Sequence, residues 1–348
     1  MLRAMAGKTR IIYHPEQRYH TLFNPRNGLF ARIEDIGADE PMWSADGPEL
    51  LDISITNFCE RQCGFCYRGS SPSGSHMTIL DFKEVLSQAA EVGVLQIAFG
   101  GGNPNQHPQF AEFLRLTHEA GIVPSYTSNG EGLTDDILKA TKRYCGAMAL
   151  SAYPPYDTLE NRIRRISDFG IKLNLHVILS DTIIGQATEW MVNQPDWFKN
   201  INAIIFLNYK PIRSGSNCGK PSESALAQFF RAVKGAGIKI GFDSCSISGI
   251  LWWLDTSHEF VESCEAAKFS AFISEDLRMY PCSFMANTDR YGDLSQNSLL
   301  DIWRNNSHFQ AMRAMHPRHE CVSCPHIPEC RGGCSFLPQI NLCNFQNS

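Results

Sequence analysis

Three cysteines lie close together in the segment Cys59-Glu60-Arg61-Gln62-Cys63-Gly64-Phe65-Cys66. The segment follows residues 51–56, in which apolar and polar residues alternate as in a β-strand. Three thiolates in one short loop can bind three irons of a [4Fe–4S] cluster and leave the fourth iron open to another ligand. The alternative is a zinc site with a distant fourth ligand. Structural zinc sites usually pair two C-x2-C turns, however, and this C-x3-C-x2-C spacing does not.

A second group of cysteines lies towards the C-terminus. The chain has 13 cysteines, and eight of them are Cys245, Cys264, Cys282, Cys321, Cys324, Cys330, Cys334 and Cys343. Disulfides are rare in a reducing compartment, so thiols at motif spacing indicate metal or iron–sulfur ligation. Taken alone, the two cysteine pairs between residues 321 and 334 also suit one zinc ion. Cys145 and Cys218 stand apart, and we interpret them as ordinary thiols.

Residues 51–210 alternate between predicted strands and helices. Apolar runs predict strands at 51–56, 94–99, 122–127, 147–152, 172–179 and 203–209. Apolar residues three and four apart predict helices at 79–92, 108–120, 134–143, 157–169 and 186–198, the second opened by Pro108. Six such units in sequence indicate a parallel sheet, and about 160 residues are too few for an eight-unit barrel. We therefore predict an α/β fold with a partial (β/α)6 TIM-like barrel, whose functional loops lie at the carboxyl ends of the strands.

The flanking segments are less regular. Turns at Asn24-Pro25 and Asn27-Gly28, with extended pieces at 11–13 and 29–33, indicate a β-rich lead-in. After the barrel we predict a helix at 222–236, a strand at 238–242 and a loop-rich segment from Cys245, which metal clusters would help to keep folded. The predicted parts are a lead-in (1–50), a barrel (51–215), a bridging helix and strand (216–244) and a cluster domain (245–348).

The cysteine loop, with Phe65 before its third cysteine, resembles the signature of the radical S-adenosylmethionine (SAM) enzymes. The resemblance covers residues 51–210. It implies that the open iron binds SAM, and that SAM is cleaved to a 5′-deoxyadenosyl radical that abstracts a substrate hydrogen atom. The run Gly100–Pro104 resembles the Gly-Gly-Glu-Pro motif that holds the SAM amino group in this family, with Asn103 in place of the glutamate. An amide oxygen still accepts from an ammonium, but without charge assistance.

The resemblance also assigns SAM binding to polar groups on the barrel strands. Ser128 and Asn129 end the third strand, Ser151 ends the fourth, and Asn174 lies on the fifth. For each of them, and for the glycine run, a turn or helix-cap role is the alternative. The residues implied to contact SAM are Phe65, Gly101, Gly102, Asn103, Pro104, Ser128, Asn129, Ser151 and Asn174.

The C-terminal cysteines resemble the SPASM extension, which holds auxiliary [4Fe–4S] clusters. The segments 280–284, 299–303 and 332–334 support the resemblance, and Leu277 stands where this extension usually has glycine. The resemblance implies one cluster on Cys264, Cys282 and Cys334 and another on Cys321, Cys324, Cys330 and Cys343, which makes three clusters in all. Cys245 either completes the first of these or is a buried free thiol.

Proteins of this pattern most often modify a peptide or protein side chain by oxidation, crosslinking or epimerisation, and the resemblance implies that function. Residues 1–50 are short for a peptide-recognition domain, so a small molecule such as a sugar or an amino acid stays open as the substrate. A non-catalytic iron–sulfur or zinc protein is the alternative of another class. Asp243, Tyr209 and Lys210 are candidate catalytic residues near the predicted barrel mouth. The implied redox partner is an electron donor such as flavodoxin or ferredoxin.

The composition excludes some partners. The formal net charge is −5, and without a basic excess we expect no nucleic-acid partner and no anionic membrane surface. No apolar run reaches the ~18 residues that a membrane-spanning helix requires. The first residues lack the apolar centre of a secretory signal, so we expect a cytoplasmic protein.

Overall fold

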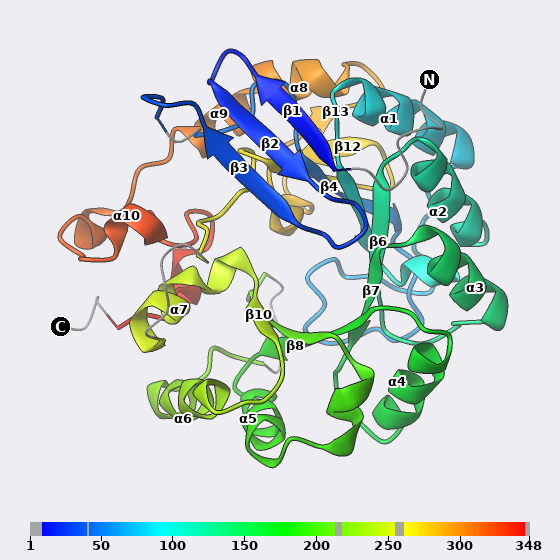
Figure 1. The fold of residues 1–348 in the computed structure, drawn as a ribbon, viewed down its shortest axis with the longest axis vertical. Helices are drawn as coiled ribbons and strands as arrows, with labels where there is room; N and C mark the ends of the chain where they lie inside the picture. Colours follow the sequence, from blue (N-terminus) through cyan, green and yellow to red (C-terminus); the bar gives the residue numbers. More distant parts are fainter. Residues whose placement is uncertain (1–8, 40–41, 213–217, 255–260, 345–348) are drawn as a thin grey trace.

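The computed structural model describes residues 9–39, 42–212, 218–254 and 261–344 (Figure 1). Its central sheet has ten strands in the order β10-β9-β8-β7-β6-β5-β4-β11-β12-β13. The six barrel strands are β4 (Leu50–Thr56), β5 (Gln96–Gly101), β6 (Val123–Ser128), β7 (Ala147–Ser151), β8 (Leu173–Leu179) and β9 (Ala203–Asn208). Each pairs in parallel with the next, which confirms the predicted partial barrel.

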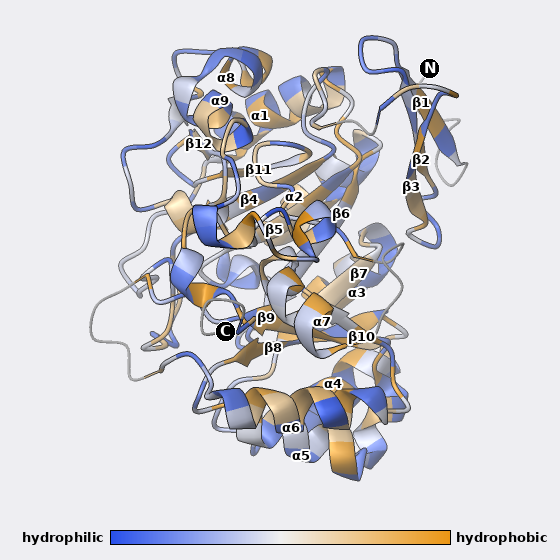
Figure 2. Cartoon of the chain, turned by 90° about the vertical axis from the view of Figure 1, so that its left-hand side faces the viewer, coloured by the Kyte–Doolittle hydropathy of each residue, from blue (hydrophilic) through white to orange (hydrophobic). Residues whose placement is uncertain are grey.

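Helices connect these strands along the outer side of the sheet (Figure 1). They are α1 (Ile79–Glu91), α2 (Phe110–Glu119), α3 (Asp135–Tyr144), α4 (Leu159–Asp168) and α5 (Ile184–Asn193). The side chain of Thr134 caps α3 by accepting from the Ile137 amide, and acidic residues in the first turn and basic residues in the last turn suit the helix dipole. Helices α4 and α5 carry both hydrophobic and hydrophilic residues in Figure 2, as amphipathic surface helices do.

The start of α2 differs from the prediction. Pro108 lies before the helix, and Gln109 is its N-cap. The short 3-10 turn Pro104–Gln106 precedes it, and the His107 ring accepts a hydrogen bond from the Gln109 amide at 3.1 Å. These local bonds hold residues 104–109 out of the helix, so the expectation that Pro108 opens α2 was wrong.

The barrel strands place apolar side chains towards the helices. In β8 the residues alternate strictly between buried and half-buried, with Leu173, Leu175, Val177 and Leu179 buried. The half-buried set on the other face includes Asn174 and His176. This period of two fixes which residues line the barrel interior.

Both edges of the barrel sheet are extended by later parts of the chain. Strand β10 (Ile240–Phe242) follows α6 (Glu223–Lys234) and pairs in parallel with β9. Strand β11 (Ser270–Ile273) pairs in parallel with β4, and the antiparallel strands β12 (Arg278–Tyr280) and β13 (Gly292–Asp293) follow. The segment predicted as a bridge and part of the cysteine-rich segment thus belong to the barrel's own sheet.

The turn between β11 and β12 contains Leu277, where the resemblance expects glycine. Its φ is +63°, a left-handed conformation that glycine adopts without strain. The turn is nevertheless closed, because the Leu277 amide donates to the Ser274 carbonyl at 3.1 Å. The leucine therefore retains the turn and carries the backbone strain.

The remaining segments lie around this sheet. The lead-in forms an antiparallel sheet of β1 (Arg10–His14), β2 (Tyr19–Phe23) and β3 (Phe30–Glu34), and Arg32 ties it to the body through Glu49 at 2.6 Å and Glu265 at 2.7 Å. The cysteine-rich part is loop-rich and contains the short helices α7 (Ile247–Trp253), α8 (Leu299–Asn305), α9 (Ser307–Arg313) and α10 (Ile327–Cys330). Among the described residues, no helix combines the length and the apolar character needed to cross a membrane.

Candidate functional site

The three N-terminal cysteines lie in the loop that follows β4. The Cys59 amide donates to the Ser71 carbonyl at 3.0 Å, and the Cys66 amide donates to the Cys63 carbonyl at 3.0 Å, so the loop folds back on itself. Burial raises the pKa of the Cys63 thiol; Arg61 opposes this, and charge on Cys66 and Cys59 raises the pKa further. The charges of the three thiols therefore act on one another.

The glycine run at the end of β5 packs directly on this loop. The Gly102 amide donates to the Thr56 carbonyl at 2.6 Å, and the Asn103 amide donates to the Phe58 carbonyl at 2.9 Å. A Cβ atom on Gly102 would lie 2.0 Å from the Phe58 oxygen, and one on Gly101 would lie 2.2 Å from the Thr56 oxygen. Because nothing larger than glycine fits at either position, the run brings two strand ends into contact immediately before Cys59.

Asn103 has its side-chain amide engaged within the protein. Its Nδ2 donates to the Glu131 carbonyl at 2.9 Å, and its Oδ1 accepts from the Ser128 hydroxyl at 3.3 Å and the Asn129 amide at 3.2 Å. The residue is 1% exposed. The expected contact between its oxygen and the SAM amino group would therefore require an exchange of partners.

The end of β6 reaches the cysteine loop through Asn129. The Nδ2 of Asn129 donates to the Cys59 sulfur at 3.5 Å. The neighbouring Ser128 is buried and donates to Asn105 at 2.6 Å, so its hydroxyl also supports the loop. Sequence reasoning missed Asn105, although it lies three residues after Gly102, the last glycine of the run.

Phe65 packs against the segment that follows β7, the strand that Ser151 ends. The Phe65 ring contacts the Tyr153 ring edge-on, with centroids 5.0 Å apart. Arg61 adds hydrogen bonds to the carbonyls of Tyr153 at 3.0 Å and Pro154 at 2.7 Å. The cysteine loop is thus held against the end of β7 as well as those of β5 and β6.

Asn174 does not join this group. It is the second residue of β8, near the amino end of that strand, and its Oδ1 accepts from Asn202 at 2.8 Å. Asn202 itself precedes β9. The predicted SAM contact at Asn174 therefore has no support from its position, because the loops that carry the other candidates follow the carboxyl ends of the strands.

Titratable groups line the barrel interior below these loops. Burial raises the pKa of Asp52 to about 6 and lowers the pKa of His176 to about 4, although Asp243 acts in the opposite direction on His176. The His176 ring lies 3.3 Å from the Thr127 hydroxyl. In the sequence, Asp52 and His176 occupy polar positions in the alternating patterns of β4 and β8. Nothing in these patterns distinguishes them from the ordinary polar positions of a strand.

Four C-terminal cysteines form a second group. Burial raises the pKa of Cys282 to about 12, and charge on Cys264 and Cys334 contributes in the same direction. The pKa of Cys245 is raised well above its usual value, first by burial and also by charge on Cys264 and Cys282. Two of the three cysteines that the resemblance assigns to one auxiliary cluster, Cys264 and Cys282, therefore act on Cys245.

The other C-terminal cysteines form a third group. Burial raises the pKa of Cys330 to about 11, and charge on Cys343, Cys324 and Cys321 raises it further. Among the described residues, no three His, Cys, Asp or Glu side chains are placed to hold a single metal ion, so these groups are defined by the charges their members exert on one another. Each consists of thiols alone, the donor type that iron–sulfur clusters use.

Lys210 and Asp243 form a buried ion pair next to the second cysteine group. Burial alone would lower the pKa of Lys210, but Asp243 and the sulfurs of Cys245 and Cys282 raise it above its usual value. The other oxygen of Asp243 accepts from the Ser246 hydroxyl at 2.6 Å and the Asn208 amide at 3.1 Å. With both oxygens engaged, Asp243 holds the ends of β9 and β10 together. Tyr209 is also buried.

A second buried ion pair joins the cysteine loop to the C-terminal segment. Arg68 contacts Glu275 at 2.6 Å, and Ser54 on β4 donates to the same carboxylate at 2.7 Å. Both charged side chains are less than a tenth exposed. The two residues are far apart in the sequence, so no motif spacing could have found the pair.

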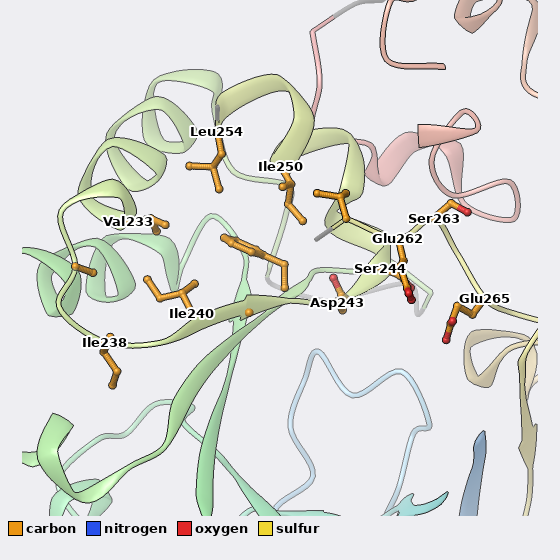
Figure 3. Close-up of a pocket in the computed structure, with 14 residues that line it drawn as sticks. Val233, Ile238, Ile240, Asp243, Ser244, Ile250, Leu254, Glu262, Ser263 and Glu265 are labelled. Atoms are coloured by element: carbon orange, nitrogen blue, oxygen red, sulfur yellow. The ribbon is translucent and has the colours of Figure 1, made fainter. Parts of the chain in front are cut away.

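A cavity of about 720 Å³ is lined in part by Ser244 and Ser263, which precede Cys245 and Cys264 in the chain (Figure 3). One side is apolar and includes Ile240, Ile250 and Leu254, whereas Asp243 and Glu262 lie on the opposite side. The described residues that line it come from the end of α6, the segment 236–244 that contains β10, the segment 250–254 and the segment 261–265, and none is a cysteine.

Comparison with known proteins gives two family matches. Residues 53–179 match the radical SAM superfamily, and residues 264–331 match the iron–sulfur cluster-binding SPASM domain. The chain is 29% identical over 109 residues to a PqqA peptide cyclase of Ruegeria pomeroyi, an alignment that covers 30% of this chain and only 28% of that protein. It is 21% identical over 319 residues to the mycofactocin maturase MftC of Mycobacterium tuberculosis, which covers 83% of this chain and 78% of that protein.

Solved structures of Streptococcus suis SuiB have the same fold. The SuiB structure bound to S-adenosylmethionine aligns with a TM-score of 0.73 at 17% identity, over 94% of each chain. The SuiB structure bound to its precursor peptide SuiA aligns with a TM-score of 0.69 at 19% identity, over 83% of this chain and 72% of that one. The chain therefore carries a radical SAM domain followed by an iron–sulfur cluster-binding SPASM domain.

Proposed function

We propose that this protein is a radical SAM enzyme that modifies a side chain of a peptide or protein by oxidation, crosslinking or epimerisation. The observation that carries the proposal is the contact between the glycine run and the cysteine loop. Gly102 and Asn103 donate to the carbonyls of Thr56 and Phe58, immediately before Cys59. This contact places three mutually interacting thiols beside backbone that has no room for a side chain.

In this proposal Cys59, Cys63 and Cys66 hold one [4Fe–4S] cluster, and SAM binds at its open iron. When bound, the cluster and SAM supply reductive cleavage to a 5′-deoxyadenosyl radical, which abstracts a hydrogen atom from the substrate. The chain's own residues orient and enclose the site. The glycine run offers half-buried backbone, with open space at Gly100, for the methionine part of SAM, and Phe65 with Tyr153 closes one side of the loop.

Two auxiliary [4Fe–4S] clusters complete the proposal. One uses Cys264, Cys282 and Cys334. We propose Cys245 as its fourth ligand because charge on Cys264 and Cys282 raises the pKa of the Cys245 thiol. The other uses Cys321, Cys324, Cys330 and Cys343. Lys210 adds a buried positive charge beside the first set, which favours extra electron density there. Because Asp243 has both oxygens engaged, we assign Lys210 and Asp243 to the electrostatics of this set and leave proton transfer open to Tyr209.

The peptide class of substrate is supported by the proteins that this chain resembles. A peptide cyclase and a mycofactocin maturase are among its relatives, and SuiB has been solved with a precursor peptide. An electron donor such as flavodoxin or ferredoxin would supply the reducing electron. We propose the cytoplasm as the location, since a reducing compartment keeps thiols available for clusters.

The test is a variant with Cys59, Cys63 and Cys66 all replaced by alanine, reconstituted anaerobically with iron and sulfide. We expect it to lose about four irons per chain and all formation of 5′-deoxyadenosine from SAM and dithionite. Cys145→Ala is the matched control, because Cys145 is a partly buried thiol at the end of α3 and belongs to none of the three groups. Unchanged SAM cleavage in the triple variant would contradict the proposal.

The substrate class needs a separate measurement. The protein is coexpressed with each candidate short peptide, including any that is encoded beside its gene, and the peptide mass is compared with that from the triple cysteine variant. A mass change that depends on the three cysteines supports peptide modification. SAM cleavage without any change in the peptide, but with turnover of a sugar or an amino acid, would favour a small-molecule substrate.

A further inference from the structure

The side chain of Asn129 connects the end of β6 to the first cysteine of the barrel loop. Its Oδ1 accepts from the Glu131 amide at 2.9 Å, and its Nδ2 donates to the Cys59 sulfur at 3.5 Å. A backbone N–H only donates, so the oxygen of the amide must face Glu131. The amino end of Asn129 is therefore the end that faces the sulfur.

The backbone of Asn129 is held equally firmly. Its amide donates to Asn103 Oδ1 at 3.2 Å, and its carbonyl accepts from Arg162 at 2.7 Å. Arg162 also pairs with the Glu131 carboxylate at 2.6 Å. The turn 129–131 is thus fixed at both ends, which limits where the Asn129 amide can point.

Asn103 is suited to this turn by being an amide. It accepts from the Asn129 amide and donates to the Glu131 carbonyl at 2.9 Å, so one side chain joins both ends of the turn. A glutamate, the usual residue of the resembling motif, is ionised at neutral pH and has no proton to donate to that carbonyl. The asparagine that stands in place of the usual glutamate at position 103 is therefore the residue that can bind both ends of the turn after β6.

We propose that Asn129 raises the reduction potential of the cluster on Cys59, Cys63 and Cys66 by donating a hydrogen bond to Cys59, and that Asn103 is the positioning residue for this bond. The inference rests on the proposed function, since it needs a cluster at this loop. A hydrogen bond to a cysteine sulfur stabilises the more negative, reduced state of an iron–sulfur cluster. The amide dipole of Asn129 is fixed before reduction and needs no reorganisation.

Asn129→Ser should keep the turn 129–131 and remove the hydrogen bond to Cys59. A serine hydroxyl can accept from the residue two positions on, as asparagine does here, but it is too short to reach Cys59. In the reconstituted full chain, we expect the reduction equilibrium constant of this cluster to fall about tenfold, a shift of about 59 mV to lower potential for one electron. The measurement is a redox titration followed by electron-spin resonance. The couple is identified by its absence from the triple cysteine variant.

Asn202→Ala is the matched control. It also removes a hydrogen-bonded asparagine amide, but one that contacts Asn174 near the amino end of β8. We expect every couple in this variant to keep its potential. In Asn129→Ser the auxiliary couples should likewise stay where they are.

The positioning role of Asn103 is tested by a double-mutant cycle. Asn103→Ala should shift the same couple in the same direction, and by less than Asn129→Ser. In the Asn129→Ser background it should cause no further shift, because the bond that it positions is already absent. An equal shift in both backgrounds would show that Asn103 acts independently and would overturn its role.

Two results would overturn the role of Asn129. One is an unchanged potential in Asn129→Ser at full iron content. The other is loss of about four irons from that variant, which would assign the side chain to retention of the cluster. If the triple cysteine variant kept all its iron, the proposed function itself would fail, and the two failures are therefore distinguishable.

Discussion

Replacing Gly102 with alanine tests whether the glycine run serves to let two loops touch. A Cβ at this position would lie 2.0 Å from the Phe58 oxygen, 2.6 Å from the Phe58 carbonyl carbon and 2.9 Å from the Asn57 carbonyl carbon. All three are backbone atoms, so no side-chain rotation relieves the clash. The loop after β5 and the cysteine loop must move apart.

The size of the effect follows from the bonds that this movement breaks. The Gly102–Thr56 and Asn103–Phe58 hydrogen bonds hold the two loops together. Overpacking costs about 1–3 kcal/mol, and each lost backbone hydrogen bond adds about 1 kcal/mol. We therefore expect Gly102→Ala to lower the free energy of unfolding by roughly 3–5 kcal/mol.

Gly100→Ala is the control within the same run. A Cβ on Gly100 would meet nothing within 4 Å, and its φ is not in the left-handed region. Alanine at such a site changes stability by about 1 kcal/mol or less. Since that Cβ points into open space where SAM would bind in our proposal, SAM affinity is not a suitable readout for this pair of variants.

The assay compares both variants after anaerobic reconstitution. Urea unfolding followed by circular dichroism gives the change in stability, and iron analysis reports whether the barrel-loop cluster is retained. We expect Gly102→Ala to unfold at lower urea and to lose up to about four irons, while Gly100→Ala keeps both properties. Equal stability and equal iron content in the two variants would refute the close-packing argument.

Three further predictions concern buried groups. Cys245→Ala should change the electron-spin spectrum of the auxiliary cluster that contains Cys282, and an unchanged spectrum would remove Cys245 from its ligands. Asp52 has a pKa raised to about 6 by burial, so the folded state binds its proton more tightly than the unfolded state, and stability is lost as pH rises from about 4 to 6. Asp52→Asn should therefore gain up to about 3 kcal/mol relative to wild type in urea unfolding at pH 7, and less than about 1 kcal/mol at pH 4; an equal gain at both pH values would contradict this. Lys210→Met leaves Asp243 buried without its cation and should cost about 3–5 kcal/mol in the same unfolding assay, most of which Asp243→Asn should restore in the double variant. No restoration would mean that the loss comes from packing.

The sequence predicted the barrel well because its signals are local. Alternation in β4 to β9 and helical spacing in the intervening segments depend on residues that are neighbours in the chain. The grouping of the cysteines comes from the resemblance, which supplied which thiols belong together, and it stays a prediction. Cys245 was left open by the sequence; charge on Cys264 and Cys282 raises its pKa, and its role as a ligand stays a proposal.

The parts that were missed depend on contacts between distant segments. Nothing near Arg68 in the sequence indicates Glu275, and nothing near Glu131 indicates that Asn103 donates to its carbonyl. Asn174 was included because the sequence does not show at which end of the barrel a polar residue on a strand lies. That position follows only from the register of the strand with its neighbours. Pro108 was placed in a helix because the turn before α2 is held by His107, a side-chain bond that no spacing rule contains.

The pairing of β11 with β4 bears on how the two cluster regions are related. Strand β4 leads into Cys59 at its carboxyl end, and β11 lies beside it in parallel, with Ile273 opposite Ile53. The chain then turns at Leu277, returns as β12 and reaches Cys282 two residues later. The barrel loop and the second cysteine group are therefore joined by one hydrogen-bonded sheet.

This continuity argues against two independent folding units. A fragment ending before residue 245 would leave the edge of β4 unpaired, and exposed strand edges promote aggregation. It would also leave Arg68 buried without the carboxylate of Glu275, a loss that costs several kcal/mol in a buried pair. The boundary at 245 is thus one of composition, and the pairing of β11 with β4 and β12 sets the separation between the first two cysteine groups.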